Sequence, residues 1–208
     1  MKLKHPELPL QTAKYLKDRG YKFHMDIVGG GVMEQEIREL VHTLQLEDCV
    51  ALVGYLKPEE VRKYMERADI FLFTSNRQEG WGAVVNESMN SGCALVSNHM
   101  VGAAPYLVRQ GHNGYLYEDG REAILFETVE RLVKDDSLRR EIGRNAYHTI
   151  TDVWNAENAA QSLMELIENV VLKNGAASEK GTSLHNLRPC APAPVISEKQ
   201  MWRKINGK

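Results

Sequence analysis

The sequence predicts an α/β fold: a doubly wound, mainly parallel sheet followed by a helical carboxyl-terminal segment. Short apolar runs alternate with stretches of helical periodicity from residue 7 to residue 117. These runs hold few polar residues, as is typical of strands covered on both faces. The chain has 208 residues, of which 43% are hydrophobic. That composition supports one packed domain and excludes a wholly disordered chain.

The predicted helices and strands alternate in chain order. Gly20 closes the first helix, and Pro58 stands at the first position of a later one. The predicted helices cover residues 7–19 and 33–46, a segment opened by Pro58, residues 83–91 and 103–109, and most of 121–173. The predicted strands cover residues 21–28, 49–53, 69–74, 94–97 and 114–117.

The composition changes near the end of the chain. We expect residues 1–174 to form the folded domain. Residues 175–208 are rich in Gly, Ala, Ser and Pro, and we expect them to form a linker and a docking tail. A tail without fixed structure explains the same composition equally well.

Charge and cysteine content exclude several classes of protein. The net charge of −2 gives no general attraction to nucleic acid or to an anionic membrane. Cys49, Cys93 and Cys190 lie far apart, which favours a reducing compartment and a cytoplasmic protein. The histidines have no metal-ligand spacing, so we expect no metal. Pro6 and Pro9 interrupt the amino terminus, which does not resemble a signal peptide.

Ligands of doubly wound sheets bind beyond the carboxyl ends of the strands, so the loops there are the candidate sites. Gly30 and Gly31 follow the predicted strand 21–28 and precede a helix, whose first amides suit an anion. A tight turn explains the glycines equally well. Glu34 stands where a dinucleotide fingerprint requires its third glycine, which argues against an oxidoreductase.

The loop after residues 69–74 carries two acids around a glycine-rich turn. Glu79 precedes Gly80-Trp81-Gly82, a helix is predicted to start near Ala83, and Glu87 lies in its first turn. Helix-start amides suit a diphosphate, and carboxylates suit the hydroxyl groups of a sugar and a ribose. Alternatively, Glu87 only stabilises its helix and Glu79 is exposed to solvent. This alternative explains each acid singly but not the Gly-Trp-Gly sequence between them.

The segment TSNRQEGWGAVVNESMNSGCALVS closely resembles the donor-binding motif of retaining glycosyltransferases of family 4, which have the GT-B fold. The resemblance continues, in the family's order, through VGGGVMEQEIREL, VALVGYL, ERADIFLFTS, VGAAPYLV and HNGYLY. It covers about residues 4–172, and the ordered set is far more specific than an acidic pair alone.

The resemblance implies that residues 1–174 bind a nucleoside diphosphate sugar, and that transfer retains the anomeric configuration without metal or cofactor. It implies that Glu79 binds hydroxyls of the donor sugar, Glu87 binds the ribose and Lys4 binds the donor phosphate. Glu79 and Lys4 are the candidate catalytic residues. The implied donor-binding residues are Gly30, Gly31, Leu56, Glu79, Gly80, Trp81, Gly82, Ala83, Val84 and Glu87. Without the resemblance, Leu56 would be a core residue and Lys4 a solvated charge.

The resemblance also shows what this sequence lacks. The family places an arginine five residues before the lysine, on a strand that would precede Lys4, and an acceptor-binding domain before that. We therefore expect a fragment that is inactive alone, with the amino-terminal domain as its partner and with peripheral membrane association through that half. We expect the gap in the sheet to be closed by a homodimer, by strand exchange or by residues 194–197.

The expected function is donor binding in a hexosyltransferase of polysaccharide biosynthesis. Two alternatives stay open from the sequence. One is a non-catalytic nucleotide-sugar-binding module, and the other is an inverting GT-B enzyme or a sugar-nucleotide epimerase.

Overall fold

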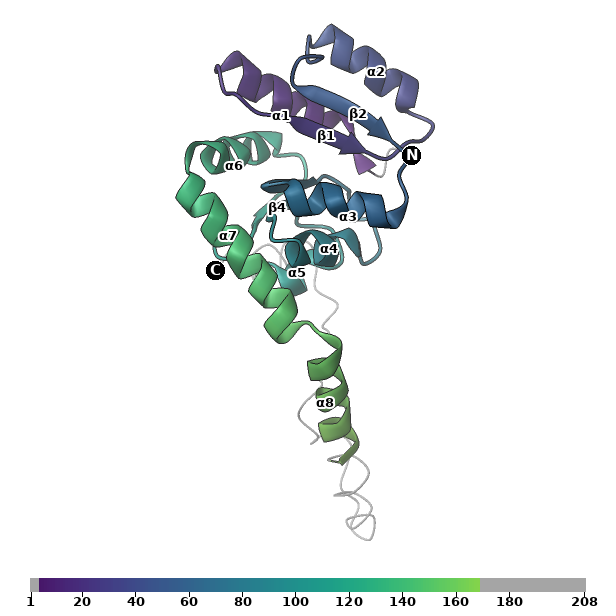
Figure 1. Cartoon of the computed structure of the whole chain (residues 1–208), viewed down its shortest axis with the longest axis vertical. Helices are drawn as coiled ribbons and strands as arrows, with labels where there is room; N and C mark the ends of the chain where they lie inside the picture. The colour runs from purple at the N-terminus through teal and green to yellow at the C-terminus, as the bar shows by residue number, and fades with distance from the viewer. Residues whose placement is uncertain (1–3, 169–208) are drawn as a thin grey trace.

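A computed structural model of the protein describes residues 4–168, and it confirms the α/β fold (Figure 1). The helices are α1 (Glu7–Asp18), α2 (Glu34–Thr43), α3 (Pro58–Arg67), α4 (Val84–Asn90), α5 (Ala104–Leu107), α6 (Glu122–Lys134), α7 (Asp136–His148) and α8 (Ala156–Ile167), with a π-helical turn at Thr149–Val153. The strands are β1 (Met25–Val28), β2 (Val50–Gly54), β3 (Ile70–Phe73), β4 (Ala94–Asn98) and β5 (Tyr115–Tyr117). The predicted tail, 175–208, lies outside the described residues.

The predicted strand 21–28 and the predicted helix 33–46 are shortened most, because the chain leaves the helices α1 and α2 through residues in a left-handed conformation. After α1, Gly20 has φ +78° and the amide of Tyr21 donates to the carbonyl of Leu16 at 3.2 Å, so the strand begins only at Met25. After α2, Gln45 has φ +57° and ends the helix in the same left-handed conformation. Positive φ at these two positions therefore sets both boundaries.

The strands are parallel, as predicted, but the described residues form two hydrogen-bonded sheets instead of one. β1 pairs with β2, and β3, β4 and β5 form the second sheet in that order. Helix α1 packs against both sheets: Leu10 and Ala13 belong to the hydrophobic cluster of α2 and β2, and Leu16 belongs to the cluster of β4, β5 and α6. One helix therefore joins the two parts.

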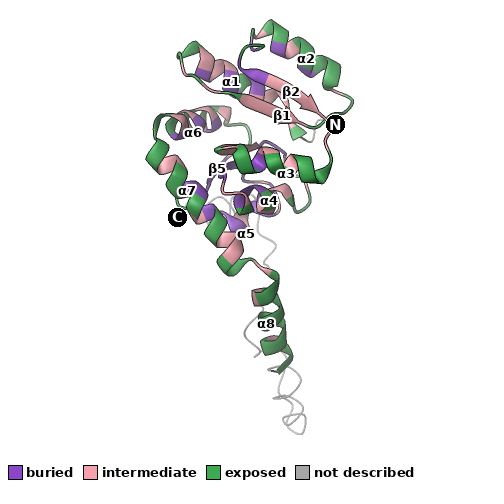
Figure 2. Cartoon of the chain, viewed as in Figure 1, coloured by how far each residue is buried: buried purple, intermediate pink, exposed green. Residues whose placement is uncertain are grey.

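The largest core surrounds β4, every residue of which is buried. Helices α4, α5, α6 and α7 and both neighbouring strands cover it. Helix α8 differs, because it has no buried residue (Figure 2) and extends away from the rest of the fold (Figure 1). Within residues 4–168, none of the helices has the length and hydrophobicity that a membrane span requires.

Candidate functional site

Four loops follow strands β1 to β4, and direct contacts join them in pairs at the carboxyl edges of the sheets. The amide of Gly29, after β1, donates to the carbonyl of Gly54, at the end of β2, at 2.8 Å. After β3, the hydroxyl of Thr74 donates to the carbonyls of Lys4 at 2.9 Å and His5 at 3.1 Å. The start of the described chain is thus fixed beside the loop that carries Glu79.

Lys4 and Glu79, 75 positions apart in sequence, form an ion pair. The ammonium group of Lys4 also lies 5.3 Å from the centroid of the Phe73 ring, close enough for a cation–π contact. The Glu79 side chain is only 17% exposed, whereas that of Lys4 is 53% exposed. The structure therefore joins a fixed carboxylate to a more exposed cation.

Asn76 orders the loop in front of Glu79, a role that was not predicted from the sequence. Its side-chain oxygen accepts from the amide of Gln78 at 3.0 Å, and its carbonyl accepts from the amide of Glu79 at 3.0 Å. Its side-chain nitrogen lies 3.1 Å from Nε2 of His5. An Asn two or three residues past a strand end is a recognisable turn signal, but its contact with His5 depends on the tertiary structure.

The glycine-rich turn is held against the loop after β4. The amide of Gly102 donates to the carbonyl of Gly80 at 3.1 Å, and the amide of Ala103 donates to the carbonyl of Trp81 at 2.8 Å. Gly82 has φ +77°, and a Cβ atom there would lie 2.8 Å from Cγ1 of Val101. Gly82 is therefore required by packing and by backbone conformation, while Gly80 and Trp81 are exposed.

Helix α4 begins at Val84, and Ala83 is its N-cap, so the predicted start at residue 83 is one residue early. The first amides of a helix lack partners inside it, which leaves those of Ala83 and Val84 available to a ligand. Glu87 lies in the first turn and is exposed. Its carboxylate makes no hydrogen bond or ion pair with any of residues 4–168, so the structure does not bring it into contact with the Lys4–Glu79 pair.

The other predicted binding residues lie in the loops after β1 and β2. Gly30 and Gly31 are exposed, and a Cβ atom at Gly30 would meet only Oε2 of Glu34, at 3.6 Å. Leu56 is half-buried and follows Tyr55, which is 90% exposed. These loops therefore leave open space, which a ligand can approach closely.

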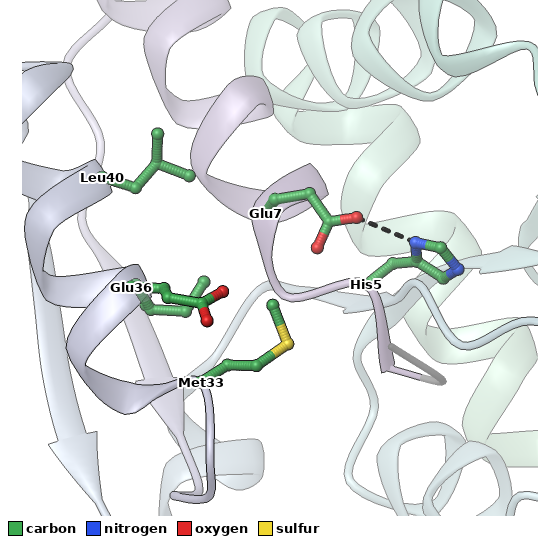
Figure 3. Close-up of a pocket in the computed structure, with 6 residues that line it drawn as sticks. His5, Glu7, Met33, Glu36 and Leu40 are labelled. Carbon is green, nitrogen blue, oxygen red and sulfur yellow. Dashed lines mark hydrogen bonds and ion pairs between the residues drawn. The ribbon is translucent and has the colours of Figure 1, made fainter. Parts of the chain in front are cut away.

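A cavity of about 390 Å³ lies between the start of α1 and helix α2. Figure 3 shows His5 and Glu7 on one side of it and Met33, Glu36 and Leu40 on the other, with Nδ1 of His5 2.8 Å from Oε1 of Glu7. None of the predicted site residues lines this cavity, although Lys4 precedes His5 directly. In the described part of the chain, no group of three or more His, Cys, Asp and Glu side chains is arranged to hold a metal ion.

The protein is thus an α/β protein in which glycines and charged side chains occupy the loops at the carboxyl ends of the strands. Residues 2–149 match the family model described as "Glycosyl transferases group 1", and the chain belongs to this family. It is 28% identical over 166 residues to the amylovoran biosynthesis glycosyltransferase AmsK of Erwinia amylovora, covering 77% of this chain and 40% of AmsK. It is also 28% identical over 151 residues to the N-acetyl-alpha-D-glucosaminyl L-malate synthase of Bacillus anthracis, covering 72% of this chain and 39% of that protein. The chain thus spans about two fifths of these relatives.

Solved structures of glycosyltransferases share the fold, and the GT-B assignment is confirmed. The crystal structure of Anabaena HepE with UDP has a TM-score of 0.70 and 22% identity, covering 82% of this chain and 46% of HepE. The C-terminal domain of a group 1 glycosyl transferase from Francisella tularensis has a TM-score of 0.65 and 22% identity, covering 75% of this chain and 82% of that one. The second match relates this chain to a domain that was crystallised separately.

Proposed function

We propose that this chain is the donor-binding domain of a retaining, family 4 glycosyltransferase. The whole protein would transfer a hexose-type sugar from a nucleoside diphosphate sugar to a glycan or glycolipid in polysaccharide biosynthesis, without a cofactor. The observation that carries the proposal is the Lys4–Glu79 pair at the carboxyl edge of β3, next to the glycine-rich turn. The similarity to the capsular polysaccharide biosynthesis glycosyltransferase CapM of Staphylococcus aureus, and to HepE, which was crystallised with UDP, supports it.

The charges suit the departure of a nucleoside diphosphate. Breaking the anomeric bond leaves negative charge on the diphosphate, and fixed cationic and amide donors stabilise that charge most in the transition state. Lys4 and the amides of Ala83 and Val84 are such donors. Because the Lys4 side chain is 53% exposed, its ammonium can turn from Glu79 toward a phosphate without disturbing the core.

The two acids suit hydroxyl groups. Asn76 orients the backbone of Glu79, whose carboxylate would accept hydrogen bonds from the donor sugar. Glu87 has no competing partner among the described residues and would accept from the ribose. Gly30, Gly31 and Leu56 would lie nearest the nucleobase and the phosphates, where the backbone is open.

The acceptor site would lie on a part of the protein outside this chain. We therefore infer that the chain alone binds donor weakly and transfers little sugar. Catalysis would take place in the cytoplasm, at the inner face of the membrane, with membrane association through the acceptor-binding half.

A titration with uridine diphosphate or guanosine diphosphate, followed by NMR, tests the donor site. We expect the amides of Glu79, Gly82, Ala83 and Glu87 to shift. Glu87→Gln should weaken binding about tenfold, because a charged hydrogen bond contributes about 1.5–3 kcal/mol.

Glu141, an exposed residue of α7, is a matched control, since Glu141→Gln makes the same change in a helix whose Gly143 packs against Gly92, next to the amino end of β4. Equal affinities of the two variants for either diphosphate would reject the role of Glu87. Amide shifts confined to residues outside the loops that follow β1, β2 and β3 would reject the site.

A further inference from the structure

His5 lies between the cavity and the loop that carries Glu79. Its Nδ1 atom lies 2.8 Å from Oε1 of Glu7, at the start of α1 and beside the cavity (Figure 3). Its Nε2 atom lies 3.1 Å from the side-chain nitrogen of Asn76, in the loop after β3. Both ring nitrogens of this histidine are therefore engaged, each by a different element of the fold.

The backbone of His5 is fixed as well as its ring. His5 has φ +44°, a left-handed conformation that is uncommon for a residue with a Cβ atom. Such a conformation costs free energy and persists where neighbouring contacts hold it. Here the hydroxyl of Thr74 donates to the carbonyl of His5 at 3.1 Å and to that of Lys4 at 2.9 Å. The imidazole is thus held beside the loop after β3 by main-chain and side-chain contacts together.

The side-chain amide of Asn76 has one orientation that satisfies its neighbours. The backbone amide of Gln78 donates to Oδ1 of Asn76 at 3.0 Å, and a backbone N–H group can only donate. If the Asn76 amide were turned over, its NH₂ group would face this N–H group and the hydrogen bond would be lost. The NH₂ group of Asn76 therefore points toward His5 and donates to Nε2.

This arrangement fixes the protonation state of the ring. To accept a hydrogen bond from Asn76, Nε2 of His5 must carry a lone pair and no proton. The proton of the neutral ring then lies on Nδ1, which donates to the Glu7 carboxylate at 2.8 Å. A further proton would have to bind at Nε2, where two donors would then face each other across 3.1 Å.

A proton on Nε2 would disturb the loop through Asn76. Either the Asn76 amide turns over, and the hydrogen bond from Gln78 is lost, or the loop moves away from the ring. The carbonyl of Asn76 also accepts from the amide of Glu79 at 3.0 Å. The same turn therefore holds the backbone of the acid in the candidate site.

The charged groups around His5 have both signs. Glu7 contacts the ring, and Glu36 of α2 lies on the other side of the cavity (Figure 3). Lys4 directly precedes His5 and is paired with Glu79. The His5 side chain is 31% exposed, so protons reach it from solvent. Histidine side chains take up a proton between about pH 8 and about pH 5.

We propose that His5 is a positioning residue that acts through Asn76. As the neutral ring with its proton on Nδ1, it orders residues 76–79, and when it binds a second proton it releases them. This inference goes beyond the proposed function, because it makes the order of the loop depend on pH whether or not the loop binds a nucleotide. Together with the proposed function, it makes donor binding weaker in acid, since the same turn holds Glu79.

Nuclear magnetic resonance of the full chain tests the proposal without any ligand. The ¹⁵N shifts of an imidazole show which nitrogen carries the proton, and we expect Nδ1 in His5 at about pH 8. As the pH falls, the backbone amide of Gln78 and the NH₂ group of Asn76 should shift with the same midpoint as the His5 ring. Protection of the Gln78 amide from hydrogen exchange should fall by up to roughly tenfold, the factor of one hydrogen bond.

His5→Gln replaces the ring with an amide that has a donor and an acceptor but does not titrate. In this variant we expect the Gln78 amide to stay protected over the whole pH range. His42→Gln is the matched control, because Nδ1 of His42 also lies beside a carboxylate, 2.7 Å from Oε1 of Glu47, but in the last turn of α2. It should leave the response of Gln78 to pH unchanged.

A proton on Nε2 of His5 at about pH 8 would overturn the proposal, and this measurement needs only the wild-type chain. A Gln78 amide that responds to pH equally in wild type and in His5→Gln would overturn it too, because the response would then come from another group. Affinity for uridine diphosphate, measured on the same samples, reports separately on the proposed function.

Discussion

Glycines at the carboxyl edges of the sheets are used in opposite ways in the loops after β3 and β4 and in the loop after β1. A Cβ atom at Gly102, after β4, would lie 2.1 Å from the carbonyl oxygen of Gly80, and one at Gly82, after β3, would lie 2.9 Å from Cε1 of Phe73. In the loop after β1, a Cβ atom at Gly31 would meet nothing within 4 Å. Glycine is thus required by the protein's own packing after β3 and β4, whereas after β1 it leaves open space.

Gly102→Ala should have the largest effect, because the clash with Gly80 is with backbone and cannot be relieved by a rotamer change. We expect a loss of about 3 kcal/mol in the free energy of unfolding, measured by urea denaturation. Gly80→Ala is the matched control, since its Cβ atom would meet nothing within 4 Å and its φ is not positive. If both variants were equally stable, the packed loop would not depend on this contact.

Lys4→Gln should separate binding from stability. Because more than half of the Lys4 side chain is exposed to solvent, loss of the Lys4–Glu79 ion pair should change the free energy of unfolding by less than about 1 kcal/mol. Affinity for uridine diphosphate should fall at least about tenfold if the ammonium binds phosphate. Isothermal titration calorimetry measures this affinity. The control is Lys14→Gln, because Lys14 also forms an ion pair, with Asp18 one turn along α1. An unchanged affinity would contradict the role of Lys4.

Acid should lower the free energy of unfolding through a contact that lies away from these glycine-containing loops. Hydrogen bonds from Lys134, Tyr15 and Tyr21 lower the pKa of Glu130 from 4.5 to about 2, at the contact of α1 with α6. Because the folded pKa is depressed, this stabilisation is complete above pH 4.5 and is lost as the pH falls toward 2. Chemical denaturation of wild type and Glu130→Gln between these pH values should show a smaller pH dependence in the variant. Identical slopes would place the acid sensitivity elsewhere.

The smallest change in stability should come from Gly31→Ala. The added Cβ atom has open space around it, and alanine gives the unfolded chain fewer conformations than glycine does. The variant should therefore be as stable as wild type or more stable by about 0.4–1 kcal/mol. Thermal unfolding checks this. A fall in nucleotide affinity at unchanged stability would sharpen the contrast between the loops, and a clear destabilisation would remove it.

Sequence patterns predicted the elements well where local chemistry dominates. Apolar runs became β2, β3, β4 and β5, and Pro58 opens α3 as predicted. The strand before Met25 was predicted too long, because periodicity does not show that Tyr21 is bonded back to Leu16. For the site, the sequence indicated Glu79 and Glu87 through their spacing around the glycines, and it indicated Lys4 only through the family resemblance. It gave no indication that His5 and Asn76 would meet.

The sequence by itself determined the α/β class, the order of the elements and the family, because hydrophobic period and glycine spacing are local properties of the chain. Only the tertiary structure decided that Lys4 pairs with Glu79, that Gly102 packs on Gly80, and that the sheet is divided between β1 and β3. Each of these depends on residues far apart in sequence meeting at one edge, which the packing of α1 against both sheets brings about.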